Sequence, residues 1–131
     1  MTKRMLIAVV AIFVAWSVLD FVIHGILLKP TYDATASLWR PMEEMKMPLM
    51  YGVTLAFTVC FVLIYGLIQR KSLATGILYG TLFGLATGIS MGPGTYSYMP
   101  IPLDLAWGWL AGVMVEMMLG GAIVGAIVKP D

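Results

Sequence analysis

The chain has 131 residues, of which 60% are hydrophobic and 11% charged, and its formal net charge is +1. Since soluble domains carry about 25% charged residues, this composition places the chain in a lipid bilayer, and the small net charge argues against a nucleic-acid partner. One cysteine and one histidine are too few for a disulfide framework, a thiolate metal cluster or a multi-histidine haem or metal site in one protomer. We therefore expect no cofactor.

Four stretches of the chain are long and apolar enough to cross a bilayer, since about 20 apolar residues span ~30 Å of hydrocarbon. They comprise residues 5–28, 48–68, 73–91 and 103–128. The sequence therefore predicts an all-α integral membrane protein, a four-helix transmembrane bundle forming a single domain over residues 1–131. The first stretch follows Lys3 and Arg4 as a signal peptide would, but it is longer than a signal-peptide core and no small-x-small cleavage site follows it. We expect a retained transmembrane helix.

The basic residues predict the orientation of the bundle. Five lie on one side of the predicted membrane and three on the other: Lys3, Arg4, Arg70, Lys71 and Lys129 against Lys29, Arg40 and Lys46. Cytoplasmic loops carry the excess of Lys and Arg, so we expect both termini in the cytoplasm and the segment 29–47 outside.

The segment 29–47 has the pattern of a short external amphipathic helix. Thr31 or Asp33 can cap a helix that runs through Trp39, and Pro41 suits the first position of a further turn. One interpretation is a helix that lies on the outer leaflet and covers the bundle. The alternative is a lid or docking surface, in which Trp39 and Arg40 take part.

Three polar residues interrupt the first apolar stretch. Ser17, Asp20 and His24 are three and four positions apart, which places them on one face of a helix. An ionised carboxylate in hydrocarbon costs at least ~2.5 kcal/mol, so Asp20 needs a partner within the protein. In the fourth stretch Glu116 stands in a row of glycines at intervals of four, so it faces a close neighbouring helix. That row also contains Gly108, Gly112 and Gly120.

The first and fourth stretches are antiparallel and can be neighbours in an up-down bundle. At ~1.5 Å per residue, Glu116 lies near the middle of the membrane and Asp20 roughly 5 Å further out. The sequence predicts a buried polar cluster in which the second stretch supplies hydrogen-bond donors; its members are Ser17, Asp20, His24, Glu116, Tyr65, Thr54 and Thr58. Two interpretations stay open, a proton or cation site and a structural polar clasp. Ser17, Asp20 and His24 have the composition of a hydrolytic Ser–His–Asp relay. However, the Asp and His lie side by side on one helix, which matches the geometry of that relay poorly.

Glycines recur at every fourth position of the third stretch, at Gly76, Gly80, Gly84 and Gly88. A row of glycines on one helix face allows another backbone to come close, so the row predicts helix packing. The partner helix can belong to this chain or to another copy.

Methionine is frequent, with 11 residues, and four of them follow the spacing M-x-x-M-x-M-x-x-M at Met42, Met45, Met47 and Met50. This spacing resembles the methionine motifs of copper-handling proteins, whose thioethers select Cu(I). The alternative is irregular packing at the membrane surface, which flexible methionine side chains suit.

Several segments resemble a class of small four-helix bacterial inner-membrane proteins of unknown function. They are LDFVIHGILLKPTY at 19–32, SLWRPMEEM at 37–45, the glycine-spaced stretch that begins YG at 79–88, and the Pro-rich loop that follows the third stretch. The resemblance implies a bacterial inner membrane and four helices. It implies no activity.

The sequence contains no nucleophile–base pair, phosphate loop or cofactor fingerprint, so we expect no enzymatic activity. The first functional hypothesis is a tightly packed oligomer or an accessory subunit, with the lipid bilayer and itself or other membrane subunits as partners. The alternatives are proton- or cation-coupled transport or ligand binding at the acidic cluster, and Cu(I) handling at the outer face. Transport requires a water-connected path to the cluster, whereas an accessory subunit requires only a dry, hydrogen-bonded one.

Overall fold

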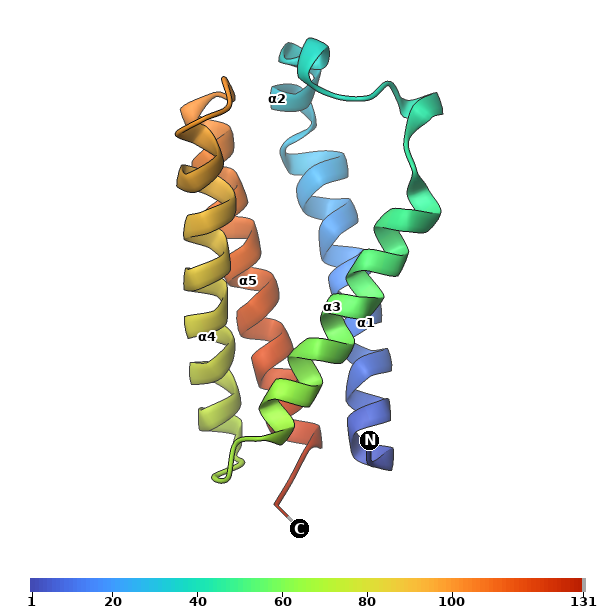
Figure 1. The fold of residues 1–131 in the computed structure, drawn as a ribbon, viewed down its shortest axis with the longest axis vertical. Coiled ribbons are helices and arrows are strands. Elements are labelled where there is room, and N and C mark those ends of the chain that lie inside the picture. The colour runs from blue at the N-terminus through green and yellow to red at the C-terminus, as the bar shows by residue number, and fades with distance from the viewer. Residues whose placement is uncertain (131) are drawn as a thin grey trace.

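A computed structural model describes residues 1–130, and within that range the chain forms helices and no β-strand. Four helical stretches are long and apolar enough to cross a membrane: Lys3–Leu27, Met47–Gly66, Leu73–Gly94 and Leu103–Ile127. They run alternately up and down, so the N-terminus, residue 130 and the loop between the second and third stretches lie at one end (Figure 1). We call it the terminal end and the opposite one the α2 end. The predictions of an all-α chain and of four spanning stretches are confirmed.

The elements follow one another in a simple order. Helix α1 (Lys3–Val22) continues through a π turn, η1 (Ile23–Leu27), into the short α2 (Lys29–Ala34). Two 3-10 turns, Ala36–Leu38 and Met42–Glu44, lead to α3 (Met47–Gly66). Helix α4 (Leu73–Ile89) ends in a second π turn, η4 (Ser90–Gly94), and α5 (Leu103–Ile127) completes the bundle.

Both π turns lie at the α2 end and both adjoin a proline. Pro30 occupies the first turn of α2, and Pro93 lies inside η4. Proline lacks an N–H and its ring clashes with the carbonyl four residues earlier, so a regular α-helical turn is strained there. A wider turn relieves the clash, as at η1, where the Leu28 N–H donates to the Ile23 carbonyl at 2.8 Å.

The predicted helix through Trp39 is shorter and starts earlier than expected. Helix α2 begins at Lys29, not after a cap at Thr31 or Asp33, and it ends at Ala34. The Thr35 hydroxyl donates back to the Thr31 carbonyl at 2.8 Å and accepts from the Trp39 indole N–H at 2.9 Å. A side chain that bonds locally in this way competes with helix continuation, so Trp39 follows in an extended conformation.

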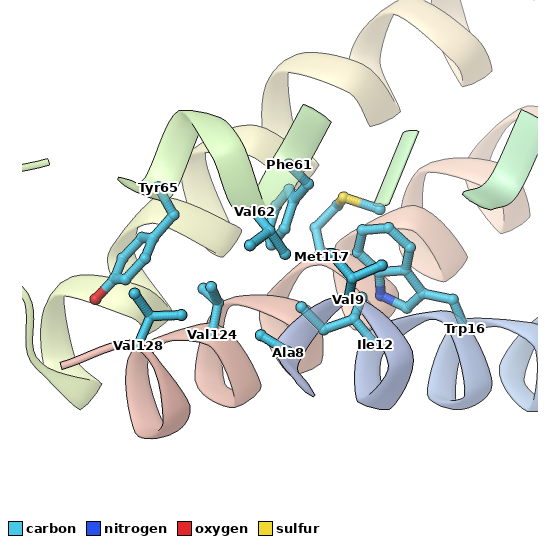
Figure 2. Close-up of a cluster of buried hydrophobic side chains, with 10 residues drawn as sticks. All are labelled: Ala8, Val9, Ile12, Trp16, Phe61, Val62, Tyr65, Met117, Val124 and Val128. Atoms are coloured by element: carbon cyan, nitrogen blue, oxygen red, sulfur yellow. The ribbon is translucent and has the colours of Figure 1, made fainter. Parts of the chain in front are cut away.

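The main hydrophobic core lies where α1, α3 and α5 meet (Figure 2). Its buried residues are Ala8, Val9, Ile12, Trp16, Phe61, Val62, Tyr65, Met117, Val124 and Val128. Aromatic rings connect the layers, with Trp16 edge-on to Phe61 at a centroid distance of 5.2 Å and Phe61 tilted against Tyr79 at 4.6 Å. A second core at the α2 end joins the start of α5 to α2; it contains Ile101, Leu105, Ala106 and Trp109.

The glycine row of α4 packs against α5 of the same chain. A Cβ on Gly80 would overlap the Met117 carbonyl oxygen, and one on Gly76 would overlap that of Gly121. Gly121 and Gly125 form the opposing surface, and a Cβ on Gly125 would lie 2.7 Å from the Ser72 carbonyl oxygen. The partner that the sequence left open is therefore α5 within this chain.

The second small-residue row of α5 packs against α1 and η1. A Cβ on Gly120 would lie 2.6 Å from the Trp16 ring, and one on Gly112 would lie 3.1 Å from Ile23. Gly108 faces Leu28 in the same way, at 2.8 Å. Large side chains of α1 thus sit in the notches that the α5 glycines leave, which makes the two helices antiparallel neighbours.

Candidate functional site

Glu116 is buried in the α1–α5 interface, with 8% of its surface exposed. Because Gly112 lies opposite Ile23 and Gly120 opposite Trp16, the register places Glu116 against the turn of α1 that contains Asp20. The Trp16 indole N–H donates to the Glu116 main-chain carbonyl at 2.6 Å, which holds the two helices at this level.

The Glu116 carboxyl is buried and incompletely hydrogen-bonded. Glu116 Oε1 has no hydrogen-bond partner among residues 1–130, and the register of α1 against α5 places Asp20 on the turn of α1 that faces it. Two ionised carboxylates can only accept hydrogen bonds, so neither can serve the other. One proton on either carboxyl supplies the missing donor and removes the repulsion between like charges.

Ser17 adds a second unsatisfied atom one turn from Asp20. Its Oγ is buried and has no hydrogen-bond partner within the described range. The great majority of buried polar side-chain atoms have a partner. Ser17 Oγ on α1 and Glu116 Oε1 on α5 are therefore two buried oxygens without a partner among residues 1–130.

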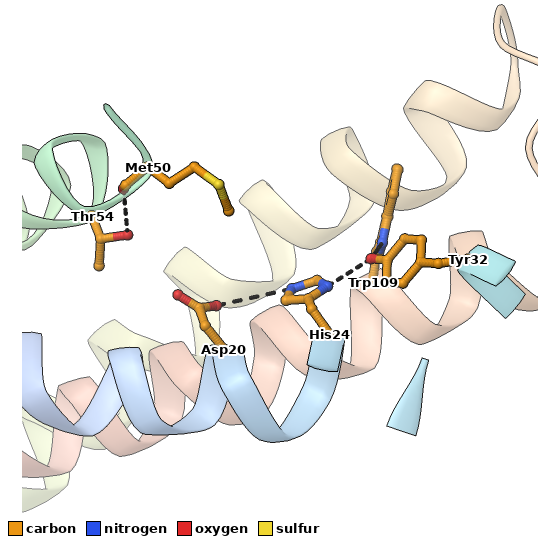
Figure 3. Close-up of polar contacts among 6 residues, drawn as sticks. All are labelled: Asp20, His24, Tyr32, Met50, Thr54 and Trp109. Carbon is orange, nitrogen blue, oxygen red and sulfur yellow. Dashed lines mark hydrogen bonds and ion pairs between the residues drawn. The ribbon is translucent and has the colours of Figure 1, made fainter. Parts of the chain in front are cut away.

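A chain of polar contacts connects Asp20 to the α2 end (Figure 3). His24 Nε2 lies 3.9 Å from Asp20 Oδ1, and His24 Nδ1 lies 2.6 Å from the Tyr32 hydroxyl. The Trp109 indole N–H donates to that hydroxyl at 2.7 Å. Since the hydroxyl oxygen accepts from Trp109, its hydrogen is free for His24 Nδ1, and the ring hydrogen of neutral His24 then sits on Nε2, toward Asp20.

Tyr32 lies in α2, outside the membrane-spanning stretches. Burial raises the pKa of its hydroxyl above the usual value, the Trp109 hydrogen bond lowers it, and the negative charge of Asp20 adds to the rise. With a raised pKa the hydroxyl stays protonated at neutral pH, so it remains a hydrogen-bond donor to His24.

Asp20 and His24 are open on one side, unlike Glu116. Their side chains are 41% and 37% exposed. Helix α3 tilts away from the other helices toward the α2 end (Figure 1), and its Leu49, Met50 and Val53 are exposed there. The cluster is therefore buried at Glu116 and accessible from the side at Asp20.

The predicted donors from α3 do not serve the acidic cluster. The Tyr65 hydroxyl donates to the Ser72 carbonyl at 3.0 Å, close to the terminal end. The Thr58 hydroxyl donates to the Thr54 carbonyl at 2.7 Å, and that of Thr54 to the Met50 carbonyl at 3.1 Å. In an apolar medium a threonine takes the nearest carbonyl, one turn back on its own helix, and the tilt of α3 removes Thr54 from α1.

The external candidates have separate surroundings. The Trp39 ring packs edge-on against Tyr32 at 5.4 Å and Trp109 at 6.0 Å, so it covers the hydrogen bond between them, while Arg40 is exposed. Met42, Met47 and Met50 are 78%, 42% and 52% exposed, and Met45 is half-buried. Among residues 1–130 no three His, Cys, Asp or Glu side chains gather as metal ligands.

Three aromatic residues at the site were not predicted as part of it. Tyr32 follows His24 by eight positions, so it continues the four-residue spacing of Asp20 and His24, and that spacing could have indicated it. The contact of Trp109 with Tyr32 joins residues 77 positions apart. No local pattern indicates that contact or the bond from Trp16 to Glu116.

Comparison of the chain with protein-family models, curated proteins and solved structures finds no match. The resemblance to small bacterial inner-membrane proteins therefore stays a prediction. The functional argument rests on the geometry of the α1–α5 interface.

Proposed function

We propose that this protein binds and releases a proton within the membrane at the Asp20–Glu116 pair, as the coupling site of a proton-linked transport or ligand-binding protein. One observation carries the proposal: the buried Glu116 has a carboxyl oxygen without a partner among residues 1–130, and it faces the turn of α1 that contains a second carboxyl, Asp20. Ionisable residues inside membrane helices commonly form proton relays or substrate pathways.

The surroundings suit proton exchange better than a static clasp. A clasp would satisfy its polar atoms, whereas Ser17 and Glu116 each keep a buried atom without a partner among residues 1–130. The half-exposed Asp20 and His24 give the pair access from one side. The separation of 3.9 Å between His24 Nε2 and Asp20 Oδ1 is too long for a direct hydrogen bond but short enough for the two groups to interact by charge.

The chemistry follows from the order of the groups. With one proton on the pair, one carboxyl donates to the other and a single negative charge remains. His24, when protonated, balances that charge from the adjacent turn. A proton that leaves the pair passes to water beside Asp20, because Nε2 of neutral His24 already carries the ring hydrogen; Tyr32 fixes the ring from its other nitrogen, Nδ1. The pair titrates as a unit.

The proposal includes location and orientation. The helices belong to a bacterial inner membrane, with both termini in the cytoplasm, as the excess of basic residues at the terminal end supports. The α2 end then faces outward, and the chain from Tyr32 to Glu116 leads from the outer surface to the middle of the membrane. The role is non-enzymatic and requires no cofactor.

Infrared spectroscopy of the purified protein tests the proton site, because a protonated carboxyl has a carbonyl band that a carboxylate lacks. The expected result is a pH-dependent band in wild type that is lost or shifted in both Glu116→Gln and Asp20→Asn. The matched control is Glu43→Gln, since Glu43 lies exposed in the 3-10 turn Met42–Glu44. A spectrum in which Glu116→Gln and Asp20→Asn change no protonated carboxyl band would refute the proposal.

A second candidate is assembly as an oligomer or accessory subunit, favoured by one observation. Asp20 and His24 lie in the spanning stretch Lys3–Leu27 yet are 41% and 37% exposed, and lipid is a costly neighbour for both. A helix from a second chain could cover them in place of water. Single cysteines introduced at Phe21, which is 67% exposed, in a Cys60→Ala background would form a disulfide-linked dimer if a second copy lay there. Cross-linking to unrelated chains would instead indicate an accessory role.

A further inference from the structure

A cavity of about 500 Å³ opens at the terminal end, far from the acidic pair. The first turn of α1, the loop after α3 and the end of α5 surround it. Four of its lining residues are cationic, namely Lys3, Arg4, Lys71 and Lys129. Three separate elements thus direct positive charge to one hollow.

Within residues 1–130, the lining of the cavity carries positive charge only. Among residues 1–130 no acidic side chain lines the cavity, and the ion pairs found in that range involve other residues. Two of the lysines are held in place, since Lys71 Nζ donates to the Ile68 carbonyl at 2.6 Å and Lys129 Nζ to the Gly125 carbonyl at 3.5 Å. The N-terminus of α1, where the Met5 N–H donates to the Thr2 hydroxyl oxygen at 3.2 Å, adds partial positive charge.

An apolar groove of about 400 Å³ begins at the same Lys3. It follows one face of α1 and is lined by Leu6, Ile7, Val10 and Ala11. At ~1.5 Å per residue it extends roughly 10 Å from Lys3 toward the middle of the helix. The cationic cavity and this shallow apolar face of α1 therefore meet at Lys3.

We infer that these two features bind one anionic phospholipid, with its phosphate headgroup in the basic cavity and an acyl chain along the groove. Basic pockets between helices at the cytoplasmic side hold anionic headgroups by charge, and lysine stems can cover apolar surface while their ammonium groups reach the phosphate. A free phosphate ion would satisfy the cavity and leave the groove unused, so the continuity of the two favours a lipid.

The lipid site is independent of the acidic pair. Asp20 lies 17 residues after Lys3 on the same helical stretch, which is roughly 25 Å along the axis. Loss of lipid binding would leave the proton proposal standing, and loss of the carboxyl band would leave the lipid site standing.

Thermal melting of the full chain in neutral detergent tests the inference, with dioleoyl phosphatidylglycerol, dioleoyl phosphatidylcholine and inorganic phosphate as probes at equal concentrations. We expect stabilisation by phosphatidylglycerol alone. Lys71→Gln/Lys129→Gln should weaken its apparent binding by about tenfold or more, since two cations are lost. The matched control, Lys29→Gln/Lys46→Gln, removes two lysines from the α2 end and should bind as wild type does.

Two further variants separate the parts of the site. Lys71→Arg/Lys129→Arg keeps the charge and should retain binding even if the Gln variant proves less stable. Val10→Trp fills the groove and should weaken phosphatidylglycerol binding with all charges intact. Equal stabilisation by phosphatidylcholine, equal stabilisation by inorganic phosphate, or an equal loss in the Lys29→Gln/Lys46→Gln control would overturn the inference.

Discussion

The close approach of α4 and α5 predicts that one chemical change, Gly→Ala, has opposite effects at two helical positions. A Cβ on Gly80 would overlap the Met117 carbonyl oxygen and lie 3.0 Å from the Gly121 Cα. A Cβ on Gly52 in α3 meets nothing within 4 Å. The obstacles at Gly80 are main-chain atoms, which no side-chain rotation moves, so the two helices must separate to admit the methyl group.

The expected change in the free energy of unfolding has two contributions. Alanine favours a helix over glycine by about 1 kcal/mol, and this gain applies at both positions. Gly52→Ala should therefore raise the free energy of unfolding by up to ~1 kcal/mol. Inserting a methyl group into a packed interface costs about 1–3 kcal/mol. The difference between the variants isolates this packing cost, because the helix term cancels, and Gly80→Ala should be the less stable by about 1–3 kcal/mol.

Reversible unfolding in mixed micelles, followed by far-UV circular dichroism, measures this difference. Gly88→Ala is an intermediate case on the same helix face. Its Cβ would lie 3.3 Å from the nearest atom, the Leu110 carbonyl oxygen, so this variant should lose less stability than Gly80→Ala. Gly84→Leu, with a larger side chain against Met114 and Met117, should also lower stability. Equal stabilities for Gly52→Ala and Gly80→Ala would refute the backbone contact.

Three further predictions concern topology, charge and copper. In a Cys60→Ala background, a cysteine at Gln69 should be protected from an impermeant thiol reagent in intact cells and one at Tyr98 should be labelled; the reverse pattern would overturn the orientation. Asp20→Leu should harm folding less than Asp20→Lys, because it removes a charge from the span whereas lysine places a cation there; similar expression and melting of both variants would contradict this. Purified wild type should retain no stoichiometric Cu(I), since flexible methionines suit surface packing; retention that disappears when Met42, Met45, Met47 and Met50 become Leu would show the opposite.

Among the patterns in the sequence, the helical spacing of residues predicted the structure best. It located the four spanning stretches, and it placed Glu116 in the same row as Gly112 and Gly120, which face α1 in the structure. These features depend on hydrophobicity and on the 3.6-residue repeat, both of which are local. The antiparallel order of α1 and α5 then brought Asp20 opposite Glu116 without any knowledge of side-chain contacts.

Contacts that depend on the angle at which two helices cross could not be predicted from the sequence. The stripe of Thr54, Thr58 and Tyr65 is regular, yet the tilt of α3 determines what it faces. Gly121 and Gly125 are also four residues apart and form the face of α5 that packs against α4. The sequence offers two glycine rows in α5, and spacing alone does not show which row faces which helix. Hydrogen bonds such as Trp109 to Tyr32 join distant positions and follow from packing alone.

Helix α5 forms two differently built interfaces, and the candidate site lies in the one with α1. Helix α5 meets α4 through backbone contacts at Gly76, Gly80 and Gly121, which fix their separation. It meets α1 through side chains in glycine notches, Trp16 at Gly120 and Ile23 at Gly112. Side chains can shift by rotation where main-chain contacts cannot, so α1 is the more adjustable neighbour of α5.

This difference indicates where a proton would act. The Trp16 indole binds the Glu116 main-chain carbonyl, so the backbones of α1 and α5 stay tied at this level whatever the charge of the Glu116 side chain. In the proposed proton site, a change in protonation would act first on the carboxyl groups of Asp20 and Glu116, because one of them can donate to the other only while it carries a proton. Under the proposed function, loss of the proton would weaken the attraction between the two carboxyl groups and leave Asp20 to its exposed side, where His24 lies one turn away. The proposal then links a proton at Glu116 to the polar contacts that end at Tyr32 in α2.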